Sequence, residues 1–281
     1  MSDTSKILLN KITDEIVIEI LKTIVPLLNR QGIDYFIIGA FARDIELLVR
    51  GYSEPPERKT KDIDLAVMVG SLSEFQVLRA VIATLPEFEQ DEKEPYRFLF
   101  RKRYELDLLP FGEITDEKGR AELLANKTFT LEMPGFDAVF PFAETVETEE
   151  GITLRVSSLS GIVLLKLLAW QDRPERIKDI RDIDNILKHF YLLHIEEIIQ
   201  NSGDLIDLYN EKDVVFVESV SAHYVGRQIN EMLQNDPGLR DRLLRFLEKQ
   251  STGFEMARLM SPENIEDSQK IIAALYRGLK E

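Results

Sequence analysis

Two kinds of periodicity divide this chain and restrict what it can fold into. In the first half, short apolar runs typical of β-strands alternate with helical periodicity, whereas nearly every segment after residue 157 is helical in pattern. The strand-like runs cover residues 33–38, 62–69, 96–101, 103–109 and 152–156, and the helical patterns of the first half cover 5–30, 40–49 and 71–84. This order predicts an α/β (α+β) fold, with a mixed β-sheet flanked by helices.

The change of pattern near residue 157 also predicts two parts. A chain of 281 residues is long enough for two ordinary domains. We expect an α/β domain over residues 1–155 and a mainly helical domain over residues 156–281. Residues 52–61 hold two prolines and many charges and should form a loop, and residues 113–150 should form short strands and loops.

Composition excludes several classes of protein. The chain has 35 basic and 50 acidic residues, a net charge of −15, so we expect no extended basic surface for nucleic acid. Without cysteine it has no disulfide and no thiolate chemistry, and its three histidines lack the spacing of a metal site. No apolar stretch is long enough to span a membrane, and no signal peptide is visible. We therefore expect a soluble, cytoplasmic protein.

The first candidate for a functional site is a glycine turn. Gly39 and Ala40 lie where the strand-like run 33–38 meets the next helical segment. A glycine there lets the backbone approach a ligand closely, and the start of the helix presents free N–H groups to an anion. Simple turn chemistry is the alternative explanation of this glycine.

Two aspartates interrupt the next strand-like run. Because alternate residues of a strand project from the same face, Asp62 and Asp64 should point together while Ile63 and Leu65 point into the core. Two neighbouring carboxylates repel each other unless a cation lies between them. A solvated strand face is the alternative, but the strongly apolar neighbours favour a buried strand.

A third acid lies in the later strand-like run at Asp107, which has leucine on both sides. Glu105 shares its face and is the other candidate for the same role. Three carboxylates on adjacent strands beside a glycine turn favour two Mg²⁺ ions, with Mn²⁺ as a substitute, because these ions prefer oxygen ligands. The basic residues Arg97 and 101–103 on the same runs should be solvated charges, with contact to a substrate phosphate as the alternative.

These motifs resemble the nucleotidyltransferase superfamily of DNA polymerase β type, which combines a glycine turn, an Asp-x-Asp strand and a third acid. The AbiEii/AbiGii-type nucleotidyltransferases are the most similar family within it. The resemblance spans residues 33–190, and Ala40 stands where Gly or Ser is common. The motifs that carry it are Ile38-Gly39-Ala40, Ala42-Arg43-Asp44-Ile45, Asp62-Ile63-Asp64, the run 107–112 (DLLPFG), the run 166–170 (KLLAW) and the run 176–182 (RIKDIRD).

The resemblance implies transfer of a nucleoside monophosphate from an NTP to a hydroxyl acceptor. It implies that Asp62, Asp64 and Asp107 are the catalytic metal ligands. It also implies that the nucleotide is bound by Gly39, Ala40, Arg43, Lys166 and Asp182. Lys166 has a competing explanation, since a lone lysine on an apolar helix can extend to bulk water.

The acceptor stays open at this level. The resemblance implies a tRNA 3′ end or another RNA, within a toxin–antitoxin or phage-defence pair and with an antitoxin as partner. The acidic charge favours a small molecule or a protein hydroxyl instead. A catalytically degenerate nucleotide-binding or regulatory protein is the alternative to an enzyme. Ala40 favours this alternative, and the retained acids speak against it.

Overall fold

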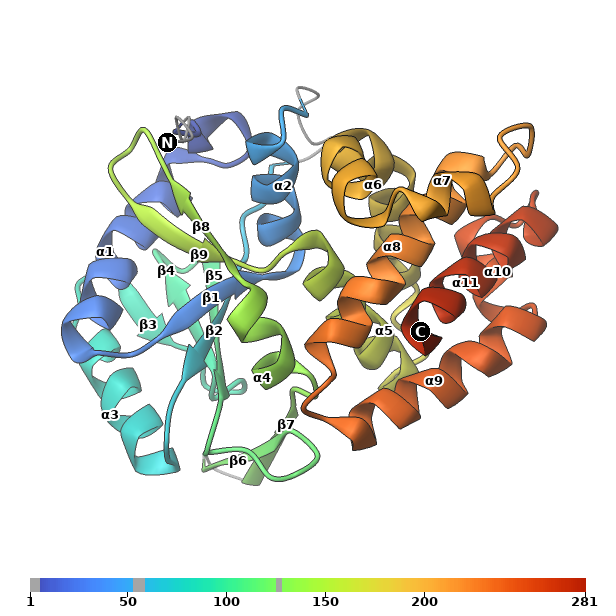
Figure 1. Cartoon of the computed structure of the whole chain (residues 1–281). Helices are drawn as coiled ribbons and strands as arrows, with labels where there is room; N and C mark the ends of the chain where they lie inside the picture. Colours follow the sequence, from blue (N-terminus) through green and yellow to red (C-terminus); the bar gives the residue numbers. More distant parts are fainter. Residues whose placement is uncertain (1–5, 53–58, 125–127) are drawn as a thin grey trace. The chain divides into compact units, whose positions relative to one another are not determined.

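The computed structural model describes residues 6–52, 59–124 and 128–281 and divides the chain into two compact units (Figure 1). The first unit is Met1–Ser158 and the second is Leu159–Glu281, whereas the sequence suggested a boundary at 155. Residues 53–58 of the expected loop lie outside the described residues. Among the described residues, no helix is long and apolar enough to cross a membrane.

The first unit is built on a seven-stranded mixed sheet, as the sequence predicts. Its strand order is β3-β4-β5-β2-β1-β9-β8, in which the pairs β2–β5 and β1–β9 are parallel and the others antiparallel. The strands are β1 Tyr35–Ile38, β2 Ile63–Met68, β3 Phe88–Gln90, β4 Arg97–Phe100, β5 Tyr104–Phe111, β8 Glu144–Glu147 and β9 Thr153–Val156. Strands β6 Arg120–Leu124 and β7 Thr128–Glu132 form a separate hairpin within the span expected to hold short strands and loops.

Helices α1 Glu15–Gln31, α2 Gly39–Val49, α3 Leu72–Ala83 and α4 Phe136–Val139 complete the first unit, with short 3₁₀ turns at Leu9–Lys11 and Phe140–Phe142. The expected helix over 5–30 is wrong in its first part, because α1 begins only at Glu15. Upstream of it, Ile7 and Thr13 form isolated β-bridges to Thr148 and Thr60, so their backbone groups pair with other segments instead.

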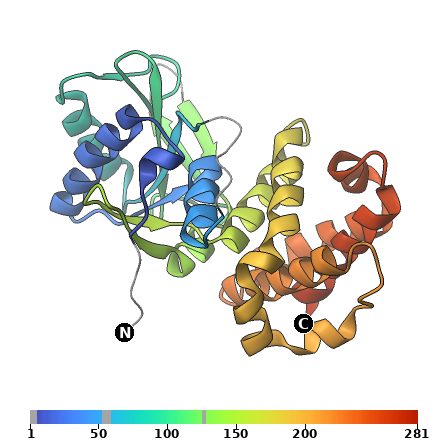
Figure 2. The same ribbon diagram turned by 90° about the horizontal axis from the view of Figure 1, so that it is seen from above.

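The second unit contains helices and no strand, and all of its residues are described (Figure 2). Its helices are α5 Leu159–Asp172, α6 Ile177–Ser202, α7 Asp204–Leu208, α8 Phe216–Met232, α9 Pro237–Thr252, α10 Glu255–Met260 and α11 Ile265–Lys280. Helix α5 is buried along most of its length, as its apolar sequence predicts. Helices α8 and α11 approach so closely that an added Cβ on Gly226 or Gly278 would collide with the facing backbone.

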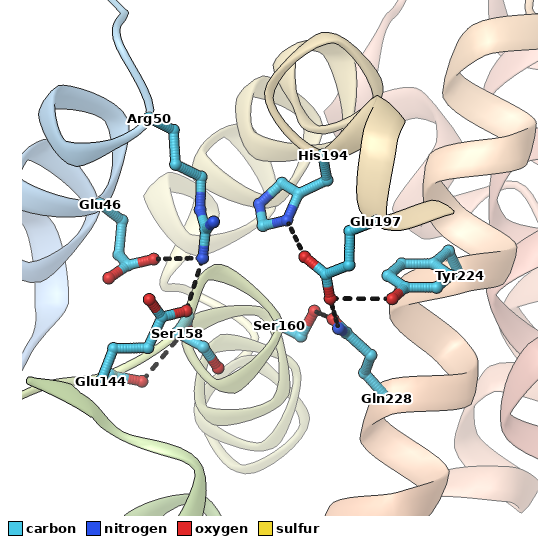
Figure 3. Close-up of polar contacts among 10 residues, drawn as sticks. Glu46, Arg50, Glu144, Ser158, Ser160, His194, Glu197, Tyr224 and Gln228 are labelled. Atoms are coloured by element: carbon cyan, nitrogen blue, oxygen red, sulfur yellow. Dashed lines mark hydrogen bonds and ion pairs between the residues drawn. The ribbon is translucent and has the colours of Figure 1, made fainter. Parts of the chain in front are cut away.

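A polar network joins α5, α6 and α8 inside the second unit (Figure 3). The Glu197 carboxylate accepts hydrogen bonds from the Tyr224 hydroxyl at 2.8 Å and from the Gln228 amide at 3.2 Å, and it lies 3.0 Å from Nδ1 of His194. Ser160 of α5 donates to the same Gln228. His194 has non-helical backbone angles, so these contacts hold α6 where it bends.

Candidate active site

Asp64 and Asp107 lie side by side on parallel strands. They are direct partners in the register of β2 and β5, so their side chains project from the same face of the sheet. Their neighbours Leu65 and Leu108, also register partners, are fully buried on the other face. The alternation of acid and leucine in both strands therefore leads directly to a half-buried pair of carboxylates.

Asp62 is placed differently from the sequence expectation. Strand β2 begins at Ile63, so Asp62 precedes the strand and its side chain is exposed. Because Ile63 pairs with Leu106, the residue before Ile63 lies next to Glu105. The pKa of Glu105 is raised, mainly by burial, and the negative charges of Asp62 and Asp107 add to this against the opposing charge of Arg97. Asp64, Glu105 and Asp107 thus share this face of the sheet, and Asp62 precedes β2.

Arg97 is the cation of this cluster. It lies directly opposite Asp107 in the antiparallel register of β4 and β5. Its Nε donates to Oδ1 of Asp107 at 2.7 Å and its Nη2 to Oδ2 at 2.8 Å, while Nη1 lies 2.9 Å from Oε2 of Glu105. The hydrogen bonds to Asp107 raise the pKa of the guanidinium, which therefore stays charged. Sequence reasoning treated Arg97 as a solvated charge, although the hairpin turn at 101–103 fixes its position opposite Asp107.

The donor set is suited to Mg²⁺ in chemistry but is not arranged as a ready-made metal site. In the described part of the chain, no three histidine or acidic side chains are grouped so that they could hold a metal ion. Two residues explain why the acids do not form a metal site. Arg97 binds both oxygens of Asp107. Asp62 lies outside strand β2. The carboxylates on one face still supply the hard oxygen ligands that Mg²⁺ prefers.

Gly39 lies directly against Asp64. The residue before it, Ile38, is the register partner of Asp64, and Gly39 itself has a φ of +72° and begins α2. An added Cβ on Gly39 would collide with Oδ2 of Asp64. The backbone angle therefore favours glycine here, and a Cβ would fit only if the Asp64 carboxylate shifted. Ala40 follows in the first turn of α2, where backbone N–H groups favour an anion.

Arg43 belongs to a second charged cluster one turn further along α2. Its Nε and Nη2 donate to Oδ1 of Asp44 at 3.0 and 2.8 Å. Asp44 is only 4% exposed, and Thr60 donates to its other oxygen at 3.0 Å. The structure thus gives Arg43 a role in neutralising a buried acid.

Lys166 and Asp182 form an ion-pair cluster within the second unit. The Lys166 amine lies 2.6 Å from Oδ2 of Asp182 and 3.1 Å from Oδ1 of Asp179, and Arg176 donates to the other oxygen of Asp179 at 2.6 Å. The apolar spacing of α6 predicts that Asp179 lies away from the buried side of the helix, and this prediction is wrong, because Asp179 is 3% exposed. The same spacing predicts Ile177 on the buried side of α6, but Ile177 is 41% exposed.

We expect Asp179→Ala to lower the free energy of unfolding by about 3 kcal/mol at neutral pH, because it leaves Lys166 with one anionic partner. Burial, the largest influence, raises the pKa of Asp179, but the hydrogen bond from Arg176 and the charge of Lys166 outweigh it and the pKa is lowered. The stabilisation is therefore present at neutral pH and is lost as the pH falls through this lowered pKa. Urea denaturation measures it. Asp182→Ala, at a more exposed carboxylate, is the control and should cost less; equal costs would contradict the assignment.

We expect Arg97→Gln to make thermal stability depend on Mg²⁺. Without the guanidinium, Asp107 and Glu105 repel each other, which should cost about 2 kcal/mol in EDTA. Mg²⁺ should restore part of this loss by neutralising the same acids. Thermal melts with and without Mg²⁺ measure the effect. The control is Arg101→Gln, which removes an arginine of the same hairpin that pairs with the exposed Glu87; an equal response of both variants to Mg²⁺ would refute the prediction.

Comparison with known families gives a match over most of the chain. Residues 46–273 match the model of the family described as nucleotidyl transferase AbiEii toxin, Type IV TA system. The chain therefore belongs to the AbiEii family of nucleotidyltransferase toxins. The match includes Asp62, Asp64, Asp107, Lys166 and Asp182, begins after Arg43, and extends well beyond residue 190, where the sequence resemblance ended. No curated protein matches the chain.

Comparison with solved structures also gives matches. The antibiotic-resistance factor ANT(2'')-Ia is 16% identical with a TM-score of 0.37, over 77% of this chain and 95% of that one. An antigenic nucleotidyltransferase-like protein from Paracoccidioides brasiliensis has the same identity and TM-score, over 80% and 90%. The CdnE cyclic dinucleotide synthase of Elizabethkingia meningoseptica is 12% identical with a TM-score of 0.27, over 98% and 95%. All of these similarities are remote.

Proposed function

We propose that this chain is a metal-dependent enzyme that transfers a nucleoside monophosphate from an NTP to a hydroxyl acceptor and releases pyrophosphate. The observation that carries the proposal is the parallel register of Asp64 and Asp107, with Gly39 against Asp64. Carboxylates gathered on one sheet face repel one another, so they favour a cationic ligand. Membership of the AbiEii family supports the class of reaction.

The family resemblance implies the role of each residue. Asp62, Asp64 and Asp107 would hold two Mg²⁺ ions, or Mn²⁺, which would neutralise phosphate charge and activate the acceptor hydroxyl. Gly39 and Ala40 present backbone N–H groups at the start of α2 to the triphosphate. Arg43 contributes positive charge one turn later in the same helix. Arg97 binds both carboxylate oxygens of Asp107. For a metal ion to bind Asp107, Arg97 would have to release at least one of these oxygens.

Lys166 and Asp182 enter the proposal through the family resemblance. We expect Lys166→Ala to weaken NTP binding in the presence of Mg²⁺ by about 1.5–3 kcal/mol, the scale of a charge-assisted hydrogen bond. Lys166→Arg should restore only part of the affinity, because the planar guanidinium group of arginine does not replace the compact ammonium group of lysine. Calorimetric titration measures both, with Lys188→Ala, at a lysine paired to Asp184, as the control. Unchanged affinity of Lys166→Ala would remove this lysine from the nucleotide site.

The acceptor defines the biological role. We propose a cytoplasmic toxin with an antitoxin partner, acting on an RNA such as the tRNA 3′ end, with a small molecule or a protein hydroxyl as the other acceptors to test. Pyrophosphate release should be measured with each NTP against RNA, small alcohols and proteins, with Mg²⁺ and with EDTA. Release that requires both Mg²⁺ and one acceptor class supports the proposal, and no release with any combination contradicts it.

A catalytically degenerate nucleotide-binding or regulatory protein is the second candidate function. The ion pair of Arg97 with both oxygens of Asp107 favours it, because it occupies a proposed metal ligand. Ala40 also favours it, since it supplies no hydroxyl to the triphosphate. NTP binding by calorimetry without pyrophosphate release against any acceptor would select this candidate.

A further inference from the structure

The second unit contains a pocket whose lining includes none of the residues proposed for the transfer reaction. It has a volume of about 480 Å³ and is formed by the end of α5, the segment after it, α9 and the start of α10. Its walls include Trp170, Pro174, Arg242, Arg245, Phe246 and Lys249. A volume of this size is in the range of pockets that bind small ligands or one unit of a polymer.

The basic residues come from one face of α9. Arg242, Arg245 and Lys249 follow one another at helical spacing, so their side chains lie in a row along the pocket. Helix α9 carries more basic than acidic residues, with Arg240, Arg242, Arg245 and Lys249 against Asp241 and Glu248. The whole chain has a net charge of −15, so the excess of basic residues on α9 is a local exception.

Two of these cations are available to a ligand. Arg242 is already engaged, since its Nε donates to Gln171 at 2.8 Å and its Nη2 to Asp172. Arg245 and Lys249 are exposed, and neither forms an ion pair with any residue that the structure describes. The pocket lining holds these two cations without an ion pair and one acidic residue, Glu255. The two cations suit an anion with several acceptor oxygens, and a phosphate group has this chemistry.

The aromatic wall suits a planar ring. Trp170 is only 2% exposed, its Nε1 donates to the Pro174 carbonyl at 3.0 Å, and it packs edge-on against Phe246 with 5.6 Å between ring centroids. It therefore forms the floor of the pocket and holds Phe246 in place. Phe246 is only partly buried and lies on α9 between the two available cations in sequence. Its ring is the one that a base or ribose can contact.

We propose that this pocket binds one nucleotide unit, with the phosphate held by Arg245 and Lys249 and the base or ribose against Phe246. The unit is part of a single-stranded RNA or a free nucleotide, which offer the same phosphate and ring. None of the pocket residues belongs to the carboxylate cluster on the sheet, so the proposal does not depend on the transfer reaction.

The test is RNA binding by the full-length chain in EDTA, which removes metal-dependent binding at the carboxylates. The probe is a short fluorescent single-stranded RNA of mixed sequence, followed by anisotropy. Arg245→Glu/Lys249→Glu should bind at least about tenfold more weakly than the parent. Loss of this one phosphate contact should also reduce the slope of log affinity against log salt by about 0.7.

The matched control is Lys22→Glu/Arg30→Glu, which makes the same change of charge on exposed residues of α1. It should bind RNA as the parent does, because the lost contacts are local. Competition with AMP identifies the source of the nucleotide: displacement of the RNA by AMP at similar concentration indicates a free-nucleotide site, and resistance to AMP indicates a strand-binding site. Equal RNA affinity of the parent and the α9 variant, or an equal loss in both variants, overturns the proposal.

Discussion

Asp64→Asn is expected to lower the rate of nucleotidyl transfer by about three orders of magnitude or more. The substitution keeps the shape of the side chain but removes one anionic ligand, and metal-assisted charge stabilisation accounts for several kcal/mol of the barrier. The fold should be retained, because removing one of several mutually repelling acids relieves repulsion in the absence of metal. Initial rates of pyrophosphate release and thermal melts without metal measure the two effects.

Asp34→Asn is the matched control for this prediction. Asp34 precedes β1, its side chain is 67% exposed, and its only described ion pair is a long one to Arg155. This variant should keep the parent's rate. Equal rates for Asp64→Asn and the parent would refute the catalytic role, and a large fall in melting temperature for Asp64→Asn would give the residue a structural role instead.

Gly39→Ala is expected to reduce activity by about a hundredfold and to destabilise the first unit by about 1–2 kcal/mol. The stability cost arises because Gly39 has a φ of +72°, which is unfavourable for any residue with a Cβ. The loss of activity arises because the new Cβ displaces the carboxylate of Asp64, and small displacements of catalytic groups cost about this factor. Denaturation curves and initial rates separate the two.

Gly32→Ala is the control that separates the effect of the positive φ from the effect of the contact between Gly39 and Asp64. Gly32 ends α1 with a φ of +69°, and an added Cβ there would meet nothing within 4 Å. It should therefore show a similar loss of stability with full activity. If both variants lose activity alike, the contact of Gly39 with Asp64 has no part in catalysis.

The elements that lead to the candidate site could be predicted from sequence because their patterns are local. Acid and leucine alternate in β2 and β5, and this alternation alone predicts that Asp64 and Asp107 leave the apolar face together. The glycine at the end of β1 likewise predicts the strand-to-helix turn. The pairing of β2 with β5, which makes Asp64 and Asp107 direct partners, is a long-range feature that these local patterns do not give.

The remaining features depend on pairing between distant segments. Arg97 joins the cluster only through the register of β4 with β5, and Asp62 leaves the strand because β2 begins one residue later. The first residues before α1 follow helical spacing, but Ile7 pairs with Thr148, more than half the chain away. Asp179 is buried because Lys166 and Arg176 neutralise it, which no periodicity indicates.

The most direct test of the central claim is transfer of label from NTP. The parent should be incubated with acceptor and with NTP labelled either at the α-phosphate or at the γ-phosphate, with Mg²⁺ and with EDTA. The account predicts that the α-label moves to the acceptor only with Mg²⁺, that the γ-label leaves as pyrophosphate, and that Asp64→Asn moves neither. Transfer of the γ-label to the acceptor, or transfer of the α-label in EDTA, would contradict metal-dependent nucleotidyl transfer at these carboxylates.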